Sequence, residues 1–102
     1  MAYLANKIEG QTGSGSVLVT ENGARLPTLP ARLVRLENWP VLGDLATENT
    51  INVLYGFKDQ YTHWLNAGGN TDEIIVPGQN LSNIVLRTKA EESVRIFYTW
   101  IY

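Results

Sequence analysis

His63 is the only histidine in the chain, so it is the first residue to consider for acid–base or metal chemistry. The chain has no cysteine, and a transition-metal site would therefore need carboxylates such as Asp59, four positions earlier. A lone pair of this kind, without a structural context, is typical of an ordinary surface or partly buried histidine. No nucleophile-elbow motif supports a Ser-His-Asp triad. The sequence predicts no catalytic residue, no metal site and no cofactor, and hence no enzymatic activity.

A glycine-rich stretch, GQTGSGS at 10–16, is the second candidate for chemistry, because such loops can turn backbone N–H groups toward a phosphate. It lacks the Gly-Lys-Ser/Thr ending of a P-loop, and no helical pattern follows that would add a helix dipole. Glycine and serine at this density also lose much backbone entropy when they are ordered. We therefore predict a flexible N-terminal arm over residues 1–16 and a single domain over residues 17–102.

Two acidic segments, GDLATEN at 43–49 and NAGGNTDE at 66–73, contain oxygen ligands of the kind that calcium prefers. Their carboxylates do not follow the spacing of an EF-hand loop. Solvated turns are the better interpretation, and a weak ion site between copies of the chain stays open.

Aromatic residues are the most distinctive group for binding. In a small β-domain most of them are expected in the core or on a sheet face, because each buries a large area. Tyr61, His63 and Trp64 adjoin a glycine-rich loop, where exposed rings can stack on a sugar or anchor a partner protein. These three are the candidate partner or glycan contacts, although structural or subunit-interface use is favoured.

Composition argues against several classes of function. The chain has 102 residues, which fits one domain with its own core, and a net charge of -2. Its eight Lys and Arg residues are spread along the sequence and form no cluster that would hold a phosphate backbone. No apolar run approaches the roughly 20 residues of a membrane helix, and the N-terminus lacks a signal-peptide pattern. We expect a soluble protein, made in the cytoplasm, that binds neither nucleic acid nor membrane.

Turn signals divide the first half of the domain. Asn22-Gly23 predicts a type I′ hairpin in which Val19 faces Leu26. The two prolines of LPTLP, at 26–30, place that segment at a sheet edge or at a crossing between sheets. A strand follows within residues 31–38, with Val34 and Leu36 on one face and Arg35 and Glu37 on the other.

Alternation of apolar and polar residues predicts the remaining strands. They cover residues 50–57, 61–65, 73–76, 82–88 and 92–102. In PGQNLSNIVLRT, at 77–88, Pro77-Gly78 is predicted as a turn, and three polar residues as backbone-capping turn residues: Asn80, Ser82 and Asn83. The total of about seven or eight short strands predicts an all-β fold, an antiparallel β-sandwich or small jelly-roll-like barrel.

Five segments within approximately residues 27–102 resemble small all-β virion proteins of tailed bacteriophages, of the capsid decoration or cement type. They are LPARLVRLEN, NTINVLYGF, WLNAGG, EIIVPGQNLSNIVLRT and ESVRIFYTWIY. The resemblance implies a non-enzymatic protein that binds the major capsid protein on the virion surface and forms a homo-oligomer, with a trimer favoured. It also implies that the arm extends over neighbouring subunits, with Tyr3, Leu4 and Ile8 as candidate capsid-binding residues. A carbohydrate-binding β-sandwich module and a tail or baseplate component remain the alternatives.

Overall fold

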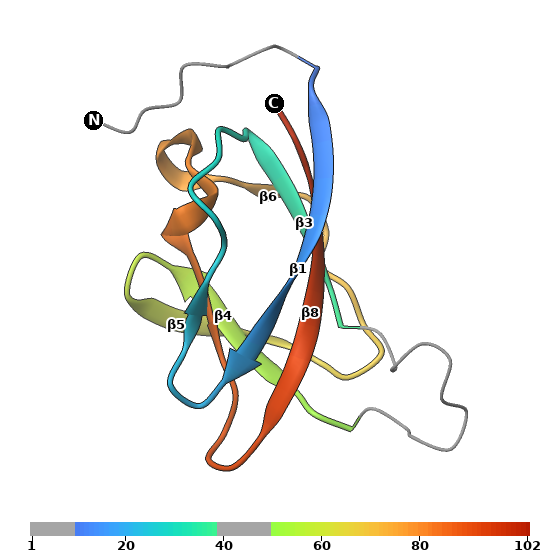
Figure 1. The fold of residues 1–102 in the computed structure, drawn as a ribbon, viewed down its shortest axis with the longest axis vertical. Coiled ribbons are helices and arrows are strands. Elements are labelled where there is room, and N and C mark those ends of the chain that lie inside the picture. Colours follow the sequence, from blue (N-terminus) through green and yellow to red (C-terminus); the bar gives the residue numbers. More distant parts are fainter. Residues whose placement is uncertain (1–9, 39–49) are drawn as a thin grey trace.

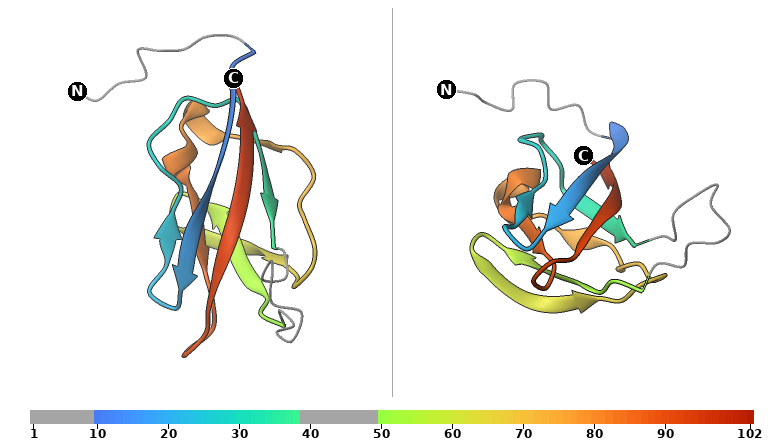
Figure 2. Two further views of the ribbon diagram at one scale, coloured as in Figure 1. Left: turned by 45° about the vertical axis from the view of Figure 1, so that its right-hand side comes forward. Right: turned by 60° about the horizontal axis from the view of Figure 1, so that its bottom comes forward.

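The fold is a sandwich of two antiparallel sheets, each of four strands. The structure is a computed structural model, and it describes residues 10–38 and 50–102. The first sheet has the strand order β1-β8-β3-β6, and the second has the order β2-β7-β4-β5. Figure 1 shows the long strands β1 and β8 side by side, and the two views of Figure 2 show the sheets as separate layers. The predicted sandwich is therefore confirmed.

Successive strands along the chain change sheet at every step except from β4 to β5, which pair in the same sheet. Their bounds are β1 Thr12–Thr20, β2 Ala24–Arg25, β3 Leu33–Glu37, β4 Val53–Phe57, β5 Gln60–Leu65, β6 Ile74–Ile75, β7 Ile84–Arg87 and β8 Ser93–Ile101. Two short 3-10 helices, η1 Pro77–Gln79 and η2 Leu81–Asn83, connect β6 to β7. The core between the sheets consists of buried aliphatic side chains from both layers together with Tyr98.

The N-terminal prediction needs a correction, because residues 12–16 are not part of a flexible arm. Strand β1 begins at Thr12 and pairs with β8 along its whole length. Gly13 lies opposite Trp100, and Gly15 lies opposite Tyr98. A Cβ atom on Gly13 would lie 2.5 Å from the Trp100 ring, and one on Gly15 would lie 2.5 Å from the Tyr98 hydroxyl. The glycines make room for two aromatic side chains. Residues 1–9, with Tyr3, Leu4 and Ile8, lie outside the described residues.

The predicted hairpin at Asn22-Gly23 is half right. A turn is present, with the Gly23 amide donating to the Thr20 carbonyl at 3.0 Å. Only Gly23 has a positive φ, at 90°, whereas a type I′ turn needs positive φ at both central residues. The flanking strands also do not pair with each other: β1 joins β8, and β2 joins β7 in the other sheet. Val19 and Leu26 are both buried, but from opposite layers.

Several other predictions are confirmed. The LPTLP segment crosses from β2 in one sheet to β3 in the other. In β3, Val34 and Leu36 are buried, and Arg35 is exposed on the opposite face. Strand β4 begins at Val53, later than the predicted residue 50, and β5 starts one residue before the predicted Tyr61. The predicted connection over 39–49 lies outside the described residues.

The segment PGQNLSNIVLRT forms a connection and then a strand as predicted, but β7 covers Ile84–Arg87 instead of 82–88, because Leu81–Asn83 form a 3-10 helix. The Asn80 side chain accepts hydrogen bonds from the amide and the hydroxyl of Ser82, at 3.0 and 2.9 Å. Asn83 Nδ2 donates to the Pro77 carbonyl at 2.7 Å. Ile84 faces the core in the following strand, and Arg87 is exposed on the outer face. These polar residues satisfy the backbone of the connection and thereby fix where β7 begins.

Asn38 is a fully buried polar residue that the sequence pattern did not single out. It follows β3, and its Nδ2 donates to the Ile51 carbonyl at 2.8 Å and to the Leu65 carbonyl at 3.3 Å. Its backbone carbonyl accepts from Gly68 at 2.7 Å. Because Leu65 ends a strand of the opposite sheet, this one amide joins the two layers.

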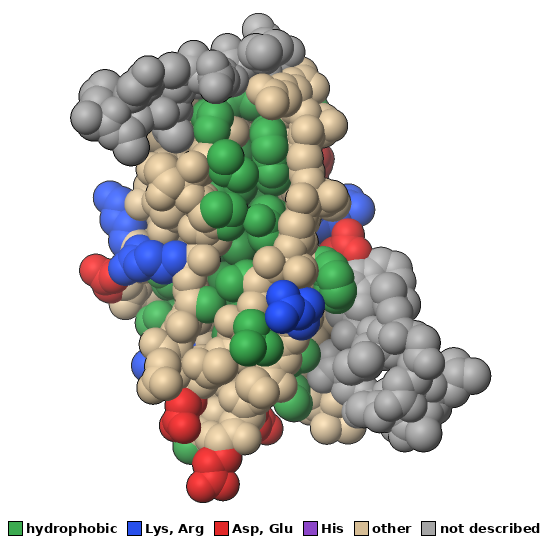
Figure 3. All heavy atoms as spheres, viewed as in Figure 1, with side chains coloured by type: hydrophobic (Ala, Val, Ile, Leu, Met, Phe, Trp, Pro, Cys, Tyr) green, Lys and Arg blue, Asp and Glu red, His purple; other side chains and the backbone are tan. Residues whose placement is uncertain are grey.

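The open side of the sandwich lies where β1 and β2 form neighbouring edges of the two sheets. Figure 3 shows a strip of hydrophobic side chains along the length of the molecule in that view. Val17, Leu29 and Trp100 are among the hydrophobic residues that pack against the core while only partly buried. The core is therefore covered less completely here than in the middle of each sheet.

Burial raises the pKa of the Tyr98 hydroxyl above its ordinary value of 10.0. The unfolded chain consequently loses this proton at lower pH than the folded protein does. The folded state then binds more protons, so stability is full below pH 10.0 and falls as the pH rises through the raised pKa. We expect Tyr98→Phe to reduce this alkaline loss, measured by urea unfolding on both sides of that pH. Parallel losses in the two proteins would contradict the assignment to Tyr98.

Candidate functional site

The His63–Asp59 pair does not form a chemical centre in the structure. Asp59 accepts a charged hydrogen bond from Arg25 Nη2 at 2.6 Å. The His63 ring packs against Tyr55 at a centroid distance of 5.2 Å and edge-on against Phe57 at 5.9 Å. Within residues 10–38 and 50–102, no three His, Asp or Glu side chains are close enough to hold one metal ion. His63 therefore packs against aromatic rings, and Asp59 forms an exposed ion pair with Arg25.

A β-bulge in β5 decides which of the candidate aromatic residues share a face. His63 pairs with Tyr55 and Tyr61 pairs with Gly56, so Thr62 between them has no partner on β4. Trp64 pairs with Leu54. Neighbouring residues of β4 point to opposite faces of the sheet, while residues two apart point to the same face.

Tyr61 and Trp64 therefore lie together on the outer face of the second sheet, whereas His63 lies on the other face with Tyr55. The predicted group of three is thus divided two to one. Trp64 keeps 50% of its surface exposed, which makes it one of the few large exposed hydrophobic residues. Gly56 is the residue in the sequence that could have indicated this bulge. Only glycine fits there, because a Cβ would lie 1.6 Å from the Gln60 carbonyl oxygen.

Two cations lie over the aromatic rings of this outer face. The Arg87 guanidinium carbon is 4.5 Å from the centroid of the Tyr61 ring, and Lys89 Nζ is 5.6 Å from that of Trp64. Both distances fall within the range of cation–π attraction. Gly56 lies between Tyr61 and Val85 of β7 in the sheet, and the absence of a Cβ there lets the β5 backbone approach closely at the bulge. We call Tyr61, Trp64, Arg87 and Lys89 the aromatic-cation cluster.

The outer face of the first sheet is a second candidate surface. Three successive rows of paired residues cross β1, β8 and β3 on this face: Thr12-Ile101-Leu33, Ser14-Thr99-Arg35 and Ser16-Phe97-Glu37. In these three rows β1 contributes only small side chains, so a shallow trough follows β8. The rows line two adjoining hollows, of about 530 and 470 Å³.

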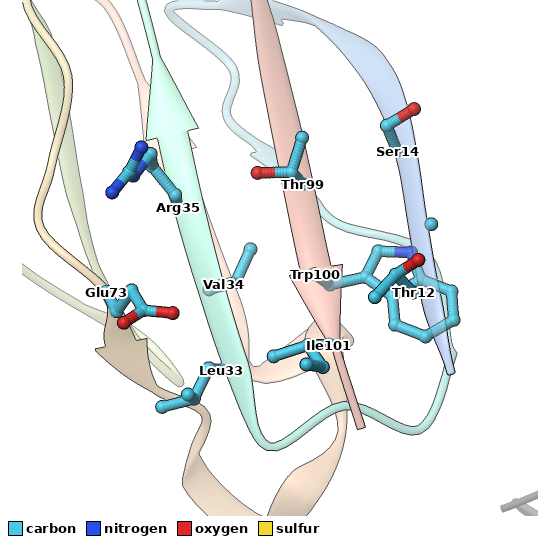
Figure 4. Close-up of a pocket in the computed structure, with 10 residues that line it drawn as sticks. Thr12, Ser14, Leu33, Val34, Arg35, Glu73, Thr99, Trp100 and Ile101 are labelled. Atoms are coloured by element: carbon cyan, nitrogen blue, oxygen red, sulfur yellow. The ribbon is translucent and has the colours of Figure 1, made fainter. Parts of the chain in front are cut away.

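Figure 4 shows the first hollow, with Arg35 and Glu73 along one side, Thr12 and Ser14 along the other, and Thr99 between them. Exposed hydrophobic residues flank the trough: Leu18 on β1 is 52% exposed, and Ile75 on β6, opposite Leu33, is 79% exposed. We call this surface the trough face. It is shallow and open to solvent, unlike the enclosed clefts that bury a small substrate.

Comparison of the chain with protein-family models, with curated proteins and with solved structures found no match. Among the described residues, no helix is long and apolar enough to cross a membrane. A function for the chain is therefore inferred from the geometry of the two outer faces.

Proposed function

We propose that the chain is a non-enzymatic structural protein of a tailed bacteriophage, which binds the outside of the capsid and stabilises it. The observation that carries this proposal is the trough face, an open sheet surface with exposed hydrophobic residues at both ends. Ile75 keeps 79% of its surface exposed and Leu18 keeps 52%. Exposed hydrophobic residues grouped on one face mark protein–protein contact surfaces.

The chemistry of the trough face suits another protein surface. Its central strand β8 holds the partly buried Phe97 and Ile101 with the exposed Thr99 between them, and β1 and β3 add the polar Thr12, Ser14 and Arg35. A mixture of apolar and polar groups is usual at non-obligate protein interfaces. The major capsid protein is the partner that we propose, at the surface of a virion assembled in the host cytoplasm.

Attachment by several copies would make weak single contacts sufficient. We propose a homo-oligomer, with a trimer favoured, in which residues 1–9 add contacts through Tyr3, Leu4 and Ile8. Linked contacts gain avidity from their high effective concentration, without any new interface. This candidate arm is shorter than the predicted residues 1–16, because residues 12–20 form strand β1.

The test uses capsids assembled from the major capsid protein encoded in the same genome. We expect the wild-type chain to bind these capsids and to raise their melting temperature. The double variant Leu18→Asp, Ile75→Asp should bind at least about tenfold more weakly, because each change places a charge in a desolvated contact. Bound copies are counted by electron microscopy, and the melting temperature is measured by calorimetry.

Trp64→Ala is the matched control, because it removes a large exposed side chain from the opposite sheet. It should leave occupancy unchanged, and circular dichroism should show all variants folded. A genome without a major capsid gene, or copies bound to the tail alone, would contradict the proposal. Equal binding of the aspartate variant would remove the trough face from it.

A further inference from the structure

The aromatic-cation cluster lies on the sheet opposite the trough face, so it is not used by the proposed capsid contact. Its parts come from two strands that are not neighbours: Tyr61 and Trp64 from β5, and Arg87 and Lys89 from the end of β7 and just beyond it. Each cation reaches across β4 to a ring on β5. The result is two parallel cation–ring pairs on one exposed sheet face.

Among residues 10–38 and 50–102, no carboxylate forms a salt bridge with either cation of the cluster. Arg25, two residues from Arg87 in the β7 register, lies on the same face and is paired with Asp59 at 2.6 Å. Within the part of the chain that the structure describes, no Asp or Glu oxygen lies within 4.0 Å of Arg87 or Lys89. The net charge of the chain is -2, so the positive charge of Arg87 and Lys89 is a local feature of the surface. Two neighbouring unpaired cations attract an anionic ligand.

The rings define what else the ligand must offer. Trp64 remains 50% exposed even with Lys89 beside it, and the face of an indole ring carries a partial negative charge. The C–H face of a pyranose ring carries partial positive charge and is apolar, so it packs well on such a surface. Leu54, between Trp64 and Arg87 in the same row, is only partly exposed. Aliphatic groups therefore contribute little to this face, whereas the centre of a protein interface is usually apolar.

We propose that the aromatic-cation cluster binds an acidic saccharide, whose sugar ring stacks on Trp64 and whose carboxylate pairs with Arg87 and Lys89. Tyr61 holds the Arg87 guanidinium over its ring and thereby positions this cation for the carboxylate. A single-stranded nucleic acid also combines stacking with negative charge, but its backbone needs a longer track of cations than these two. This proposal does not rest on capsid binding, since the two surfaces share no residue.

The test is a titration of the full chain followed by NMR, reading the Trp64 indole N–H signal and the backbone amides of β5 and β7. The probes are tri-galacturonate, tri-mannuronate and sialyllactose, each compared with its carboxyl methyl ester. We expect at least one acid to bind with a dissociation constant of millimolar order or tighter, and its ester at least about tenfold more weakly. Added salt should weaken the binding of the acid, because the pairing charges are exposed.

Variants separate the two parts of the site. Trp64→Ala should weaken binding at least about tenfold, and Arg87→Gln and Lys89→Gln should each weaken the acid several-fold without changing the ester. Arg95→Gln is the matched control, because Arg95 lies on the outer face of the other sheet, where it donates to Ser16 Oγ at 3.2 Å. It should leave the affinity unchanged.

Four outcomes would overturn the proposal. The first is no binding of any acid at 10 mM, taken as about the weakest affinity worth assigning to a site. The second and third are equal binding of acid and ester, and unchanged affinity in Trp64→Ala. The fourth is tighter binding of a ten-nucleotide oligothymidine, which is a probe of about the length of a single-strand site. All of the variants change exposed side chains, and their folding is checked from the dispersion of the same NMR spectra.

Discussion

Gly56→Ala should lower the free energy of unfolding by at least about 3 kcal/mol, which is a large part of the stability of a small domain. An ideal Cβ at this position would lie 1.6 Å from the Gln60 carbonyl oxygen and 2.9 Å from the Tyr61 Cα. Both atoms belong to backbone, so no side-chain rotation relieves the overlap. Relief requires β4 and β5 to separate at the bulge, and the ring of Tyr61 would move with them.

Urea unfolding measures this loss, and a matched glycine provides the control. Gly69→Ala adds the same methyl group at a position with ordinary φ, where the nearest atom is the Asn66 carbonyl oxygen at 3.1 Å. That variant should lose no more than about 1 kcal/mol. If Gly56→Ala loses equally little, the tight bulge is wrong. A Gly56→Ala chain that does not fold agrees with the expectation.

The double variant Gly13→Ala, Gly15→Ala should lose about 3 kcal/mol, the second largest effect that we expect. Each added methyl group would overlap an aromatic side chain of β8, that of Trp100 for Gly13 and that of Tyr98 for Gly15. Tyr98 is only 7% exposed, so its ring has little room to move away from the methyl group. Loss of ring packing against the core then lowers the stability of the whole first sheet.

The sign of this change distinguishes a packed strand from a flexible segment. In a flexible segment, Gly→Ala would leave stability unchanged, and in an uncrowded strand it would raise stability by about 0.4–1 kcal/mol through the unfolded state. Ser14→Ala and Ser16→Ala are the controls, because these side chains lie on the exposed face of the same strand. They should stay within about 0.5 kcal/mol of wild type. A gain in stability for the glycine variant would refute the ring packing.

The two candidate surfaces depend on these glycines in different ways. Gly56 lets β4 and β5 approach closely at the bulge that places Tyr61 on the outer face, so it serves the aromatic-cation cluster. Gly13 and Gly15 let Trp100 and Tyr98 lie flat beneath β1, which holds that strand against β8 and completes the trough face. A loss of stability at either position is therefore expected to weaken binding at the corresponding surface.

Alternation within a strand is a local property, and the sequence predicted it well. Val34 and Leu36 face the core because apolar side chains two residues apart share one face of a strand. Asn80 and Asn83 cap the backbone of their own connection, which requires only nearby atoms. The all-β class and the crossing at the prolines followed from the same short-range rules.

Pairing between distant segments was decided by the tertiary structure alone. The turn at Asn22-Gly23 was evident, but β1 and β2 each find a better partner in a different sheet, so the predicted hairpin register does not form. In the sequence alone, the glycines at 13 and 15 indicated a flexible segment. The aromatic rings that leave no room for a side chain at these positions belong to β8, more than 80 residues away in the sequence.

The candidate site was likewise predicted in part from the sequence and decided in part by the tertiary structure. From the sequence alone came the all-β fold, the strand that carries Tyr61 and Trp64, and their candidacy for binding. Only the tertiary structure turned His63 away from them and brought Arg87 and Lys89 onto their rings, because the bulge at Thr62 reverses the alternation of β5. A pattern of period two fixes faces within one strand, whereas a bulge depends on the partner strand that the chain meets only when it folds.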